Sequence, residues 1–160
     1  MIRQYLMVFF IFFSSNSLGD TLSVSELIIK SNKEGERPLL SLAYKRCSGL
    51  SFFLSVKFSQ SNLQEAAVNH QKSADLFSLM AAQEDASFEH QRGLENNSKS
   101  ILERQNELIE GQITRIGLFY ANRSNENYIK NGSIINGDKL IESDFRMCQE
   151  IIKEASKLNK

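Results

Sequence analysis

The stretch LSLAYKRCSGLSFFLSVKF, residues 40–58, decides the fold because its apolar residues recur with the period of a helix. A first stripe advances in steps of four, four, three and four residues: Leu39, Ala43, Cys47, Leu50 and Leu54. Six further apolar residues widen it: Leu40, Leu42, Phe52, Phe53, Val56 and Phe58. A helix that is apolar most of the way round packs on several sides, so we predict a central helix over about 38–59.

Two other structures would use the same apolar run. Its Phe and Val content is typical of a strand, but the chain offers no second strand-like run to pair with it. A membrane helix is disfavoured by three basic residues, Lys45, Arg46 and Lys57.

A short helix is predicted before the central one, over about 23–33. Ser23 and Glu26 have the spacing of a capping box at its start. Gly35 suits a helix C-cap, and Pro38 suits the first turn of the helix that follows. The core face of the helix over 23–33 is formed by three residues: Val24, Leu27 and Ile28.

A long helix is predicted after the turn SQSN, residues 59–62, with Ser61 or Asn62 as its N-cap. Its seam of small and apolar residues repeats at steps of four and three, which suits close helix packing: Leu63, Ala67, His70, Ala74, Phe77 and Ala81. The pattern weakens near Gly93–Asn97. We expect a bend or short turn there, the alternative being a helix that continues with a solvated face.

Two more helices complete the prediction. The first spans about 98–122, and its end between Ala121 and Lys130 stays open because NRSNEN and KNGSIINGDK are typical of turns. Its core stripe is Leu102, Ile109, Ile113, Ile116 and Tyr120. The second spans about 138–157 and is capped by Asp138, with a stripe of Ile141, Phe145, Cys148, Ile152 and Ala155. Residues 20–160 are therefore predicted to form one all-α domain, a bundle of four main helices plus a short N-terminal helix.

The two cysteines, Cys47 and Cys148, fall on the apolar stripes of their helices. An even number of cysteines in an exported chain favours a disulfide, which here would close a loop of about 100 residues. Two separate buried thiols are the alternative. A redox-active site is disfavoured because the sequence has no Cys-x-x-Cys motif.

The first 19 residues have the layout of a cleaved secretory signal. Arg3 gives a positive start, Leu6 to Phe13 is an unbroken apolar run, and residues 17–19 fit the rule for signal peptidase. The run is short of the roughly 20 residues that span a bilayer. We expect cleavage between Gly19 and Asp20, transient membrane contact only, and a periplasmic or extracellular protein. A retained leader that tethers the chain is the alternative.

Charge and motifs point to no particular chemistry. The chain has 19 basic and 19 acidic residues, which gives no reason to expect nucleic acid as a partner. His70 and His90 lie outside any zinc motif, and the Glu-x-x-His pairs of di-iron bundles are missing. The three glutamates of one helix are typical of a solvated face: Glu103, Glu107 and Glu110. We predict no cofactor, no metal site and no catalytic residue.

Five residues form the one aromatic and basic cluster of the sequence: Arg115, Phe119, Tyr120, Arg123 and Tyr128. They are a candidate surface patch for binding a partner. The alternative places Tyr120 in the core and the others beside a turn.

The stretch YKRCSGLSFFL, residues 44–54, resembles an Arg-Cys-x-x-Leu element of a family of small exported helical proteins from marine bacteria and their phages. Members carry a signal peptide, this cysteine helix, and a second cysteine in a C-terminal helix after an acidic residue, here Asp144 before Cys148. The resemblance implies an all-α fold and paired cysteines, and it implies no activity.

Together these features predict an exported protein that serves as a binding or structural accessory. Its partner would be an unidentified protein or small molecule. The alternative is a small exported enzyme whose site is assembled from scattered polar residues.

Overall fold

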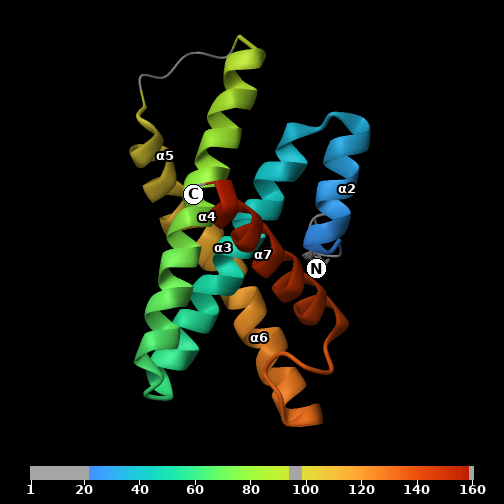
Figure 1. Ribbon diagram of the computed structural model, residues 1–160, viewed down its shortest axis with the longest axis vertical. Coiled ribbons are helices and arrows are strands. Elements are labelled where there is room, and N and C mark those ends of the chain that lie inside the picture. The colour runs from blue at the N-terminus through green and yellow to red at the C-terminus, as the bar shows by residue number, and fades with distance from the viewer. Residues whose placement is uncertain (1–21, 94–98, 159–160) are drawn as a thin grey trace, which may run out of the picture.

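The computed structural model describes residues 22–93 and 99–158, and within these ranges the chain is helical with no strand. The elements are α2 (Val24–Glu34), α3 (Arg37–Gln60), α4 (Gln64–Gln91), α5 (Ile101–Leu108), the π-helix η1 (Ile109–Ile113), α6 (Thr114–Asn131) and α7 (Lys139–Leu158). Because α5, η1 and α6 are continuous, these are four main helices and the short α2, as predicted (Figure 1). The predicted leader and its cleavage site lie outside the described residues.

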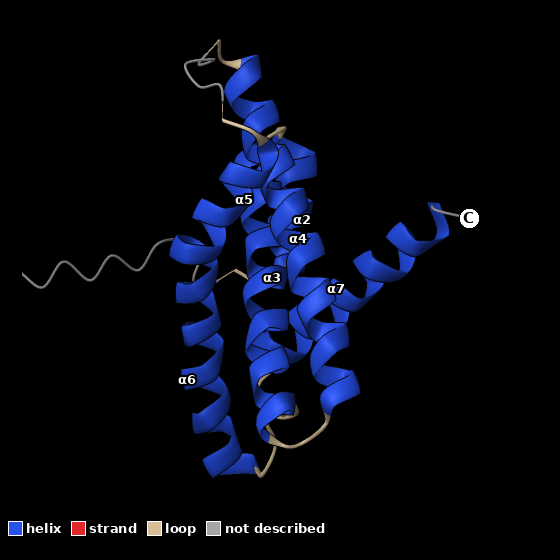
Figure 2. Ribbon diagram, turned by 90° about the vertical axis from the view of Figure 1, so that its left-hand side faces the viewer, coloured by secondary structure: helices blue, strands red, loops and turns tan. Residues whose placement is uncertain are grey.

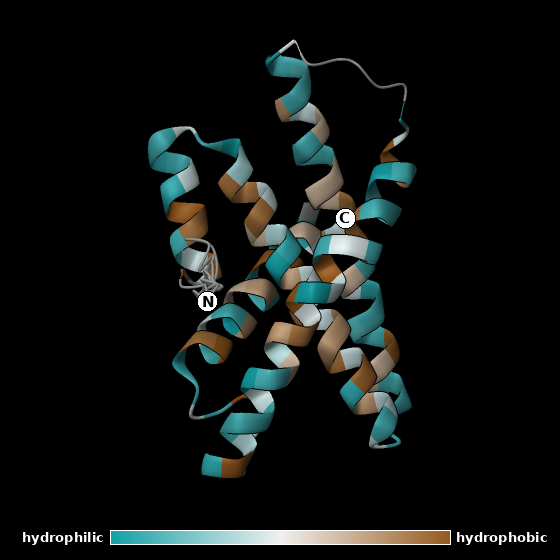
Figure 3. Ribbon diagram, turned by 180° about the vertical axis from the view of Figure 1, so that it is seen from behind, coloured by the Kyte–Doolittle hydropathy of each residue, from teal (hydrophilic) through white to brown (hydrophobic). Residues whose placement is uncertain are grey.

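The long helices α3 and α4 run side by side in opposite directions, and α6 packs along α3 (Figure 1). Helix α7 crosses the bundle obliquely and packs mainly on α2 and α3. Its last turns lean away from the other helices (Figure 2). Hydrophobic and hydrophilic segments alternate along the helices (Figure 3), as expected where each helix buries one face. No helix in the described ranges is long and apolar enough to cross a membrane.

The start of the domain follows the predicted capping signals. The Ser23 hydroxyl accepts from the Glu26 N–H at 3.3 Å, and the Ser23 N–H donates to the Glu26 carboxylate at 2.7 Å. The Ser23 N–H and the Ser23 hydroxyl both donate to the Glu26 carboxylate, and these hydrogen bonds lower the pKa of Glu26. Gly35 ends α2 with a φ of 66°, a left-handed conformation that suits glycine, and Pro38 lies in the first turn of α3.

The predicted N-cap of α4 is wrong. Ser61 instead ends α3, with its N–H donating to the carbonyls of Lys57 and Phe58, and Asn62 turns the chain with a φ of 60°. The cap position then falls on Leu63, which offers no side-chain hydrogen bond. Leu63 is 53% exposed, so the predicted seam begins at Ala67 rather than at Leu63.

The seam between α3 and α4 is built from small residues on both helices. Ala67, Ala74 and Ala81 are buried on α4 at intervals of seven residues. They face serines that repeat with the same interval on α3: Ser41, Ser48 and Ser55. The Ser48 hydroxyl donates to the Ala74 carbonyl at 2.8 Å. Small side chains let the two backbones approach closely, and the hydroxyls find acceptors in the facing helix.

The segment NRSNEN, expected to be a turn, is helical, and α6 ends only at Asn131 with Gly132 as its C-cap. Ser124 and Asn127 are buried in this segment because they bind the loop that follows. The Ser124 hydroxyl donates to the Ile134 carbonyl at 2.6 Å, and the Asn127 amide donates to the carbonyls of Ser133 and Asn136 at 2.8 and 2.9 Å. The turn-forming residues therefore hold the next loop instead of breaking the helix.

Helices α3 and α6 cross at two glycines. A Cβ at Gly49 would lie 2.5 Å from Cγ2 of Ile116 and 3.0 Å from the backbone nitrogen of Gly117.

Leu102, predicted in the core, is 64% exposed, whereas Ile113 and Tyr120 of the same predicted stripe are buried. The break near Gly93 is confirmed in so far as α4 ends at Gln91; residues 94–98 lie outside the described ranges.

Candidate functional site

The predicted disulfide is present. Cys47 of α3 and Cys148 of α7 are bonded across a sequence separation of 101 residues, with their Cα atoms 5.5 Å apart. Their exposed fractions are 0% and 4%, so the bond lies inside the core among Val24, Leu27 and Phe77. The alternative of two separate thiols is therefore wrong, and the bond covalently fastens α7 to the central helix.

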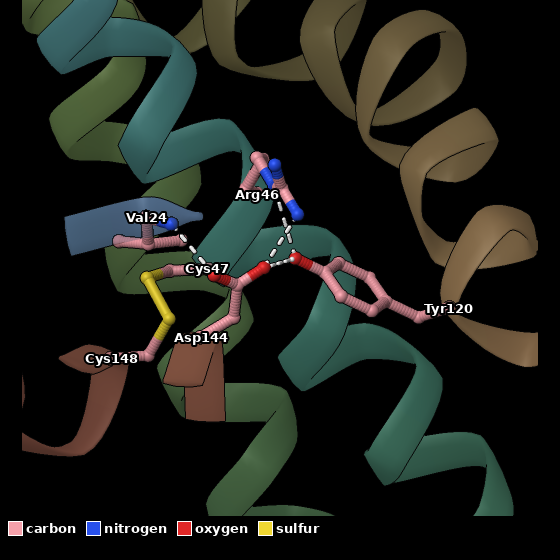
Figure 4. The surroundings of a disulfide bond; sticks show 6 residues. All are labelled: Val24, Arg46, Cys47, Tyr120, Asp144 and Cys148. Carbon is pink, nitrogen blue, oxygen red and sulfur yellow. Dashed lines mark hydrogen bonds and ion pairs between the residues drawn. A yellow bond between two sulfur atoms is a disulfide. The ribbon is translucent and has the colours of Figure 1, made fainter. Parts of the chain in front are cut away.

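Beside the disulfide lies a buried carboxylate, Asp144 (Figure 4). One of its oxygens accepts from Nη2 of Arg46 and from the hydroxyl of Tyr120, each at 2.6 Å. The other oxygen accepts from the backbone N–H of Val24 at 2.6 Å. Three donors from three other helices thus converge on one side chain of α7.

Arg46 completes this group of residues, which we call the polar centre: Arg46, Tyr120, Asp144 and the Val24 N–H. The Arg46 Nε donates to the Tyr120 hydroxyl at 3.1 Å, and Nη1 donates to the carbonyl of Leu22. Its guanidinium carbon also lies 5.8 Å from the ring centroid of Tyr120 and 6.0 Å from that of Phe119. The planar guanidinium can serve several partners at once because it has five N–H donors.

Burial controls the protonation of the polar centre. It raises the pKa of Tyr120 far above its ordinary value, and the Asp144 carboxylate adds to the rise. Burial also raises the pKa of Asp144, while Arg46, the Tyr120 hydroxyl and the Val24 N–H act in the opposite direction. For Arg46, burial alone would lower the pKa, but Tyr120 and Asp144 outweigh it and raise the pKa.

Tyrosine and aspartate are groups that enzymes use for proton transfer, and a neighbouring arginine can stabilise negative charge on them. Here Tyr120 and Asp144 are 0% exposed and Arg46 is 3% exposed, so a substrate does not reach them in this conformation. Their hydrogen bonds are made to one another and to the start of α2. The arrangement joins α2, α3, α6 and α7 and serves as a structural fastening.

Sequence reasoning found the cysteines but missed the polar centre. It used Arg46 only as evidence against a membrane helix and within the family resemblance, and Asp144 only within that resemblance. A signal was available: Asp144 stands at helical spacing between Ile141 and Cys148, on the stripe predicted to be buried. A charge at such a position indicates a buried partner of opposite sign. Arg46, the residue beside Cys47, is that partner.

The candidate patch does not form one surface. Tyr120 is fully buried, as the alternative stated, and Phe119 is half-buried against it, with ring centroids 5.3 Å apart. Nε of Arg123 lies 2.6 Å from the Asp138 carboxylate at the start of α7. Arg115 and Tyr128 are exposed on α6. Asp138 also accepts from the N–H groups of Leu140 and Ile141, which confirms it as the cap of α7.

The other polar residues singled out in the sequence have structural contacts or face solvent. His70 stacks on Phe58 and lies tilted against Phe145, with centroid distances of 5.3 and 6.3 Å, and burial lowers its pKa. His90 is exposed. The Glu103 carboxylate accepts from the N–H of Ser100, the N-cap of α5, and Glu107 pairs with Lys99. In the part of the chain that the structure describes, no three His, Cys, Asp or Glu side chains are placed to hold a metal ion.

Surface depressions lie along the first half of α7. One of about 450 Å³ is lined by residues of α2 and α7, mostly polar: Ser25, Lys139, Glu142, Ser143, Arg146, Met147 and Glu150. A second shares Glu142 and Arg146 and reaches the loop before α7. Charges of both signs line them, so neither favours an anion or a cation.

Comparison of the chain with protein-family models, with curated proteins and with solved structures finds no match. The resemblance to exported proteins of marine bacteria and their phages stays a prediction.

Proposed function

We propose that this chain is exported and acts as a disulfide-stapled helical protein that binds a partner, rather than as an enzyme. The observation that carries the proposal is the buried Cys47–Cys148 bond, because disulfides form and persist in oxidising compartments. The bond is compatible with such a compartment, and the charged start, apolar run and small residues of positions 1–19 supply the expected route to it.

Binding is favoured over catalysis by where the reactive and the apolar side chains lie. Tyr120 and Asp144, whose pKa values are raised by burial, are sealed in the polar centre and hold helices together. By contrast, α6 exposes large apolar side chains at Leu118, Tyr128 and Ile129, the last being 83% exposed. Leu118 and Ile129 are eleven residues apart and so share one face of α6, and apolar groups that form a continuous exposed patch mark surfaces where proteins contact one another.

Mass spectrometry without reductant tests the export half of the proposal. The gene would be expressed in a bacterial host with a periplasm, and the protein recovered from that compartment. We expect a chain that begins at Asp20 and is about 2 Da lighter than the dithiol form. Recovery from the cytoplasm with an intact leader and free thiols would contradict export, and an intact leader with a formed disulfide would support the tethered alternative.

A matched control changes only the leader. The substitution Val8→Asp places a charge in the apolar run, so the chain should keep Met1 and stay reduced in the cytoplasm.

Cross-linking in exporting cells tests the binding half. Leu118→Asp and Ile129→Asp should each remove any cross-linked product that the unchanged protein gives. Gln83→Asp adds the same charge at an exposed position of α4 and should leave that product in place. Products that persist in both α6 variants would exclude this face as the binding surface.

A further inference from the structure

The covalent and the non-covalent fastenings of α7 lie next to each other. Arg46 precedes Cys47 on α3, and Asp144 lies one helical turn before Cys148 on α7. Both pairs therefore join the same two helices at the same level (Figure 4). We propose that the polar centre docks α7 before oxidation and holds Cys148 against Cys47, so that disulfide formation depends on Arg46, Tyr120 and Asp144.

The other contacts of helix α7 are largely apolar, and apolar packing is not directional: Ile141, Phe145, Met147, Ile151 and Ile152 pack in the core. Helix α7 packs mainly on α2 and α3, and its last turns lean away from the bundle (Figure 2). The α3–α4 pair, in contrast, is closed by the serine and alanine seam from Ser41 to Ser55. In the reduced protein the buried ion pair is thus the directional contact at the level of the thiols.

The polar centre fixes both the rotation and the height of α7. Asp144 meets donors from α2, α3 and α6 at once, and a buried carboxylate that loses these donors is strongly unfavourable. A slide of α7 by one turn, about 5.4 Å, would break all three hydrogen bonds. It would also carry Cys148 away from Cys47.

The oxidation itself is an ordinary exchange with a small disulfide such as oxidised glutathione. A thiolate of one cysteine attacks a sulfur of the small disulfide, breaks its S–S bond and releases one glutathione thiolate. The second cysteine, as thiolate, attacks the resulting mixed disulfide, forms the Cys47–Cys148 bond and releases the second glutathione thiolate. The two protons of the cysteines pass to solvent or to the released thiolates.

Thermodynamic linkage makes the proposal measurable. The effective concentration of the two thiols is proportional to the fraction of the dithiol protein in which α7 is docked. If the polar centre raises that fraction, it raises the effective concentration by the same factor. The effective concentration is obtained from the fraction of oxidised protein across a series of glutathione redox buffers, after alkylation of free thiols and mass analysis. Helicity of each reduced protein is followed by circular dichroism.

We expect Asp144→Asn to lower the effective concentration by about tenfold or more, since each factor of ten corresponds to 1.4 kcal/mol of lost docking free energy. Tyr120→Phe removes one donor to Asp144 and should lower it by a smaller factor. Glu150→Gln is the matched control: it changes an exposed carboxylate of α7 and should leave the value unchanged.

Equal effective concentrations for the unchanged protein and for Asp144→Asn, with helicity retained, would overturn the proposal, because α7 would then dock without the polar centre. If reduced Asp144→Asn does not fold, the comparison moves to Tyr120→Phe. A lowered value in that variant supports the proposal, and an unchanged value overturns it.

Discussion

At the scale of single residues, Asp144 and Arg46 are the unusual feature of this core. Removing ions from water is costly, and only a close partner and further hydrogen bonds offset that cost. Here the ions lie 2.6 Å apart, and the tyrosine hydroxyl and two backbone groups supply the further bonds. We therefore expect the pair to contribute more to the specific arrangement of the helices than to net stability.

We expect Asp144→Asn to lower the free energy of unfolding by about 3–5 kcal/mol, because it leaves Arg46 buried without its counter-charge. Urea denaturation of the oxidised protein measures the change. Glu150→Gln should stay within about 0.5 kcal/mol of the unchanged protein, as surface substitutions do. A loss below about 1 kcal/mol for Asp144→Asn would mean that water or a rearranged side chain takes over the role of the carboxylate.

Two glycines in helices should respond in opposite directions. At Gly49→Ala the new methyl group meets Ile116 and the backbone of Gly117, so we expect a loss of about 1–3 kcal/mol in stability from overpacking. At Gly111→Ala nothing lies within 4 Å of the new Cβ, so stability should stay equal or rise by about 0.5–1 kcal/mol. Thermal denaturation of both variants measures these changes in stability. A neutral Gly49→Ala would show that α3 and α6 separate easily.

At the scale of helices, α3 contacts α4, α6 and α7 in three different ways. Helices α3 and α4 use small side chains, α3 and α6 use a close crossing at Gly49 and Gly117, and α3 and α7 use the disulfide with the polar centre. A change in the seam or at the glycine crossing should therefore affect one pair of helices first, whereas a change in the polar centre affects α2, α3, α6 and α7 together.

The serine and alanine seam should tolerate little added volume. Ser48 is fully buried against α4, so Ser48→Leu forces the two helices apart, and we expect a loss of about 1–3 kcal/mol or more. The same substitution at the exposed Ser59 of α3 should change stability by less than about 0.5 kcal/mol. Equal effects at the two sites, measured by chemical denaturation, would contradict close packing along the seam.

The contact of His70 with Phe58 and Phe145 brings α3, α4 and α7 together and predicts a dependence on pH. Burial lowers the pKa of His70 in the folded protein from its ordinary value of 6.5, so below that pH the unfolded chain binds more protons. The free energy of unfolding should therefore fall as the pH drops through 6.5 toward the lowered pKa, by at most about 1.4 kcal/mol per pH unit.

Denaturation between about pH 8 and pH 5 measures this slope. His70→Gln should reduce it, while His90→Gln, at an exposed position, should leave it in place. A slope that is the same in all three proteins would assign the pH dependence to other groups.

At the scale of the whole molecule, the disulfide joins two residues that are 101 positions apart. It therefore restricts the conformations that the unfolded chain can adopt. In the chain-entropy account, closing a loop of this length adds about 4–5 kcal/mol to stability. The double substitution Cys47→Ser and Cys148→Ser should lower the free energy of unfolding by about that amount, measured against the oxidised protein. Reductant should destabilise the unchanged protein and leave the double variant unaffected; a double variant as stable as the oxidised protein would contradict the expectation.

The sequence predicted the helices well where local patterns govern them. Ser23, Glu26, Gly35, Pro38 and Asp138 act as predicted, because caps and breaks depend on neighbours within one turn. The disulfide was also predictable, since two cysteines on two buried stripes leave one pairing. The errors fall where an adjoining element makes use of a residue: Asn127 stays helical by binding the loop that follows α6, and Ser61 ends α3, which leaves Leu63 at the cap position of α4.

By itself, then, the sequence determined an all-α chain, most of its helix boundaries and the covalent bond between α3 and α7. Only the tertiary structure decided that Arg46, Tyr120, Asp144 and the start of α2 meet at one buried point. The physical reason is range: periodicity and capping act between residues three or four apart, whereas the partners of Asp144 lie 24, 98 and 120 residues away in the chain.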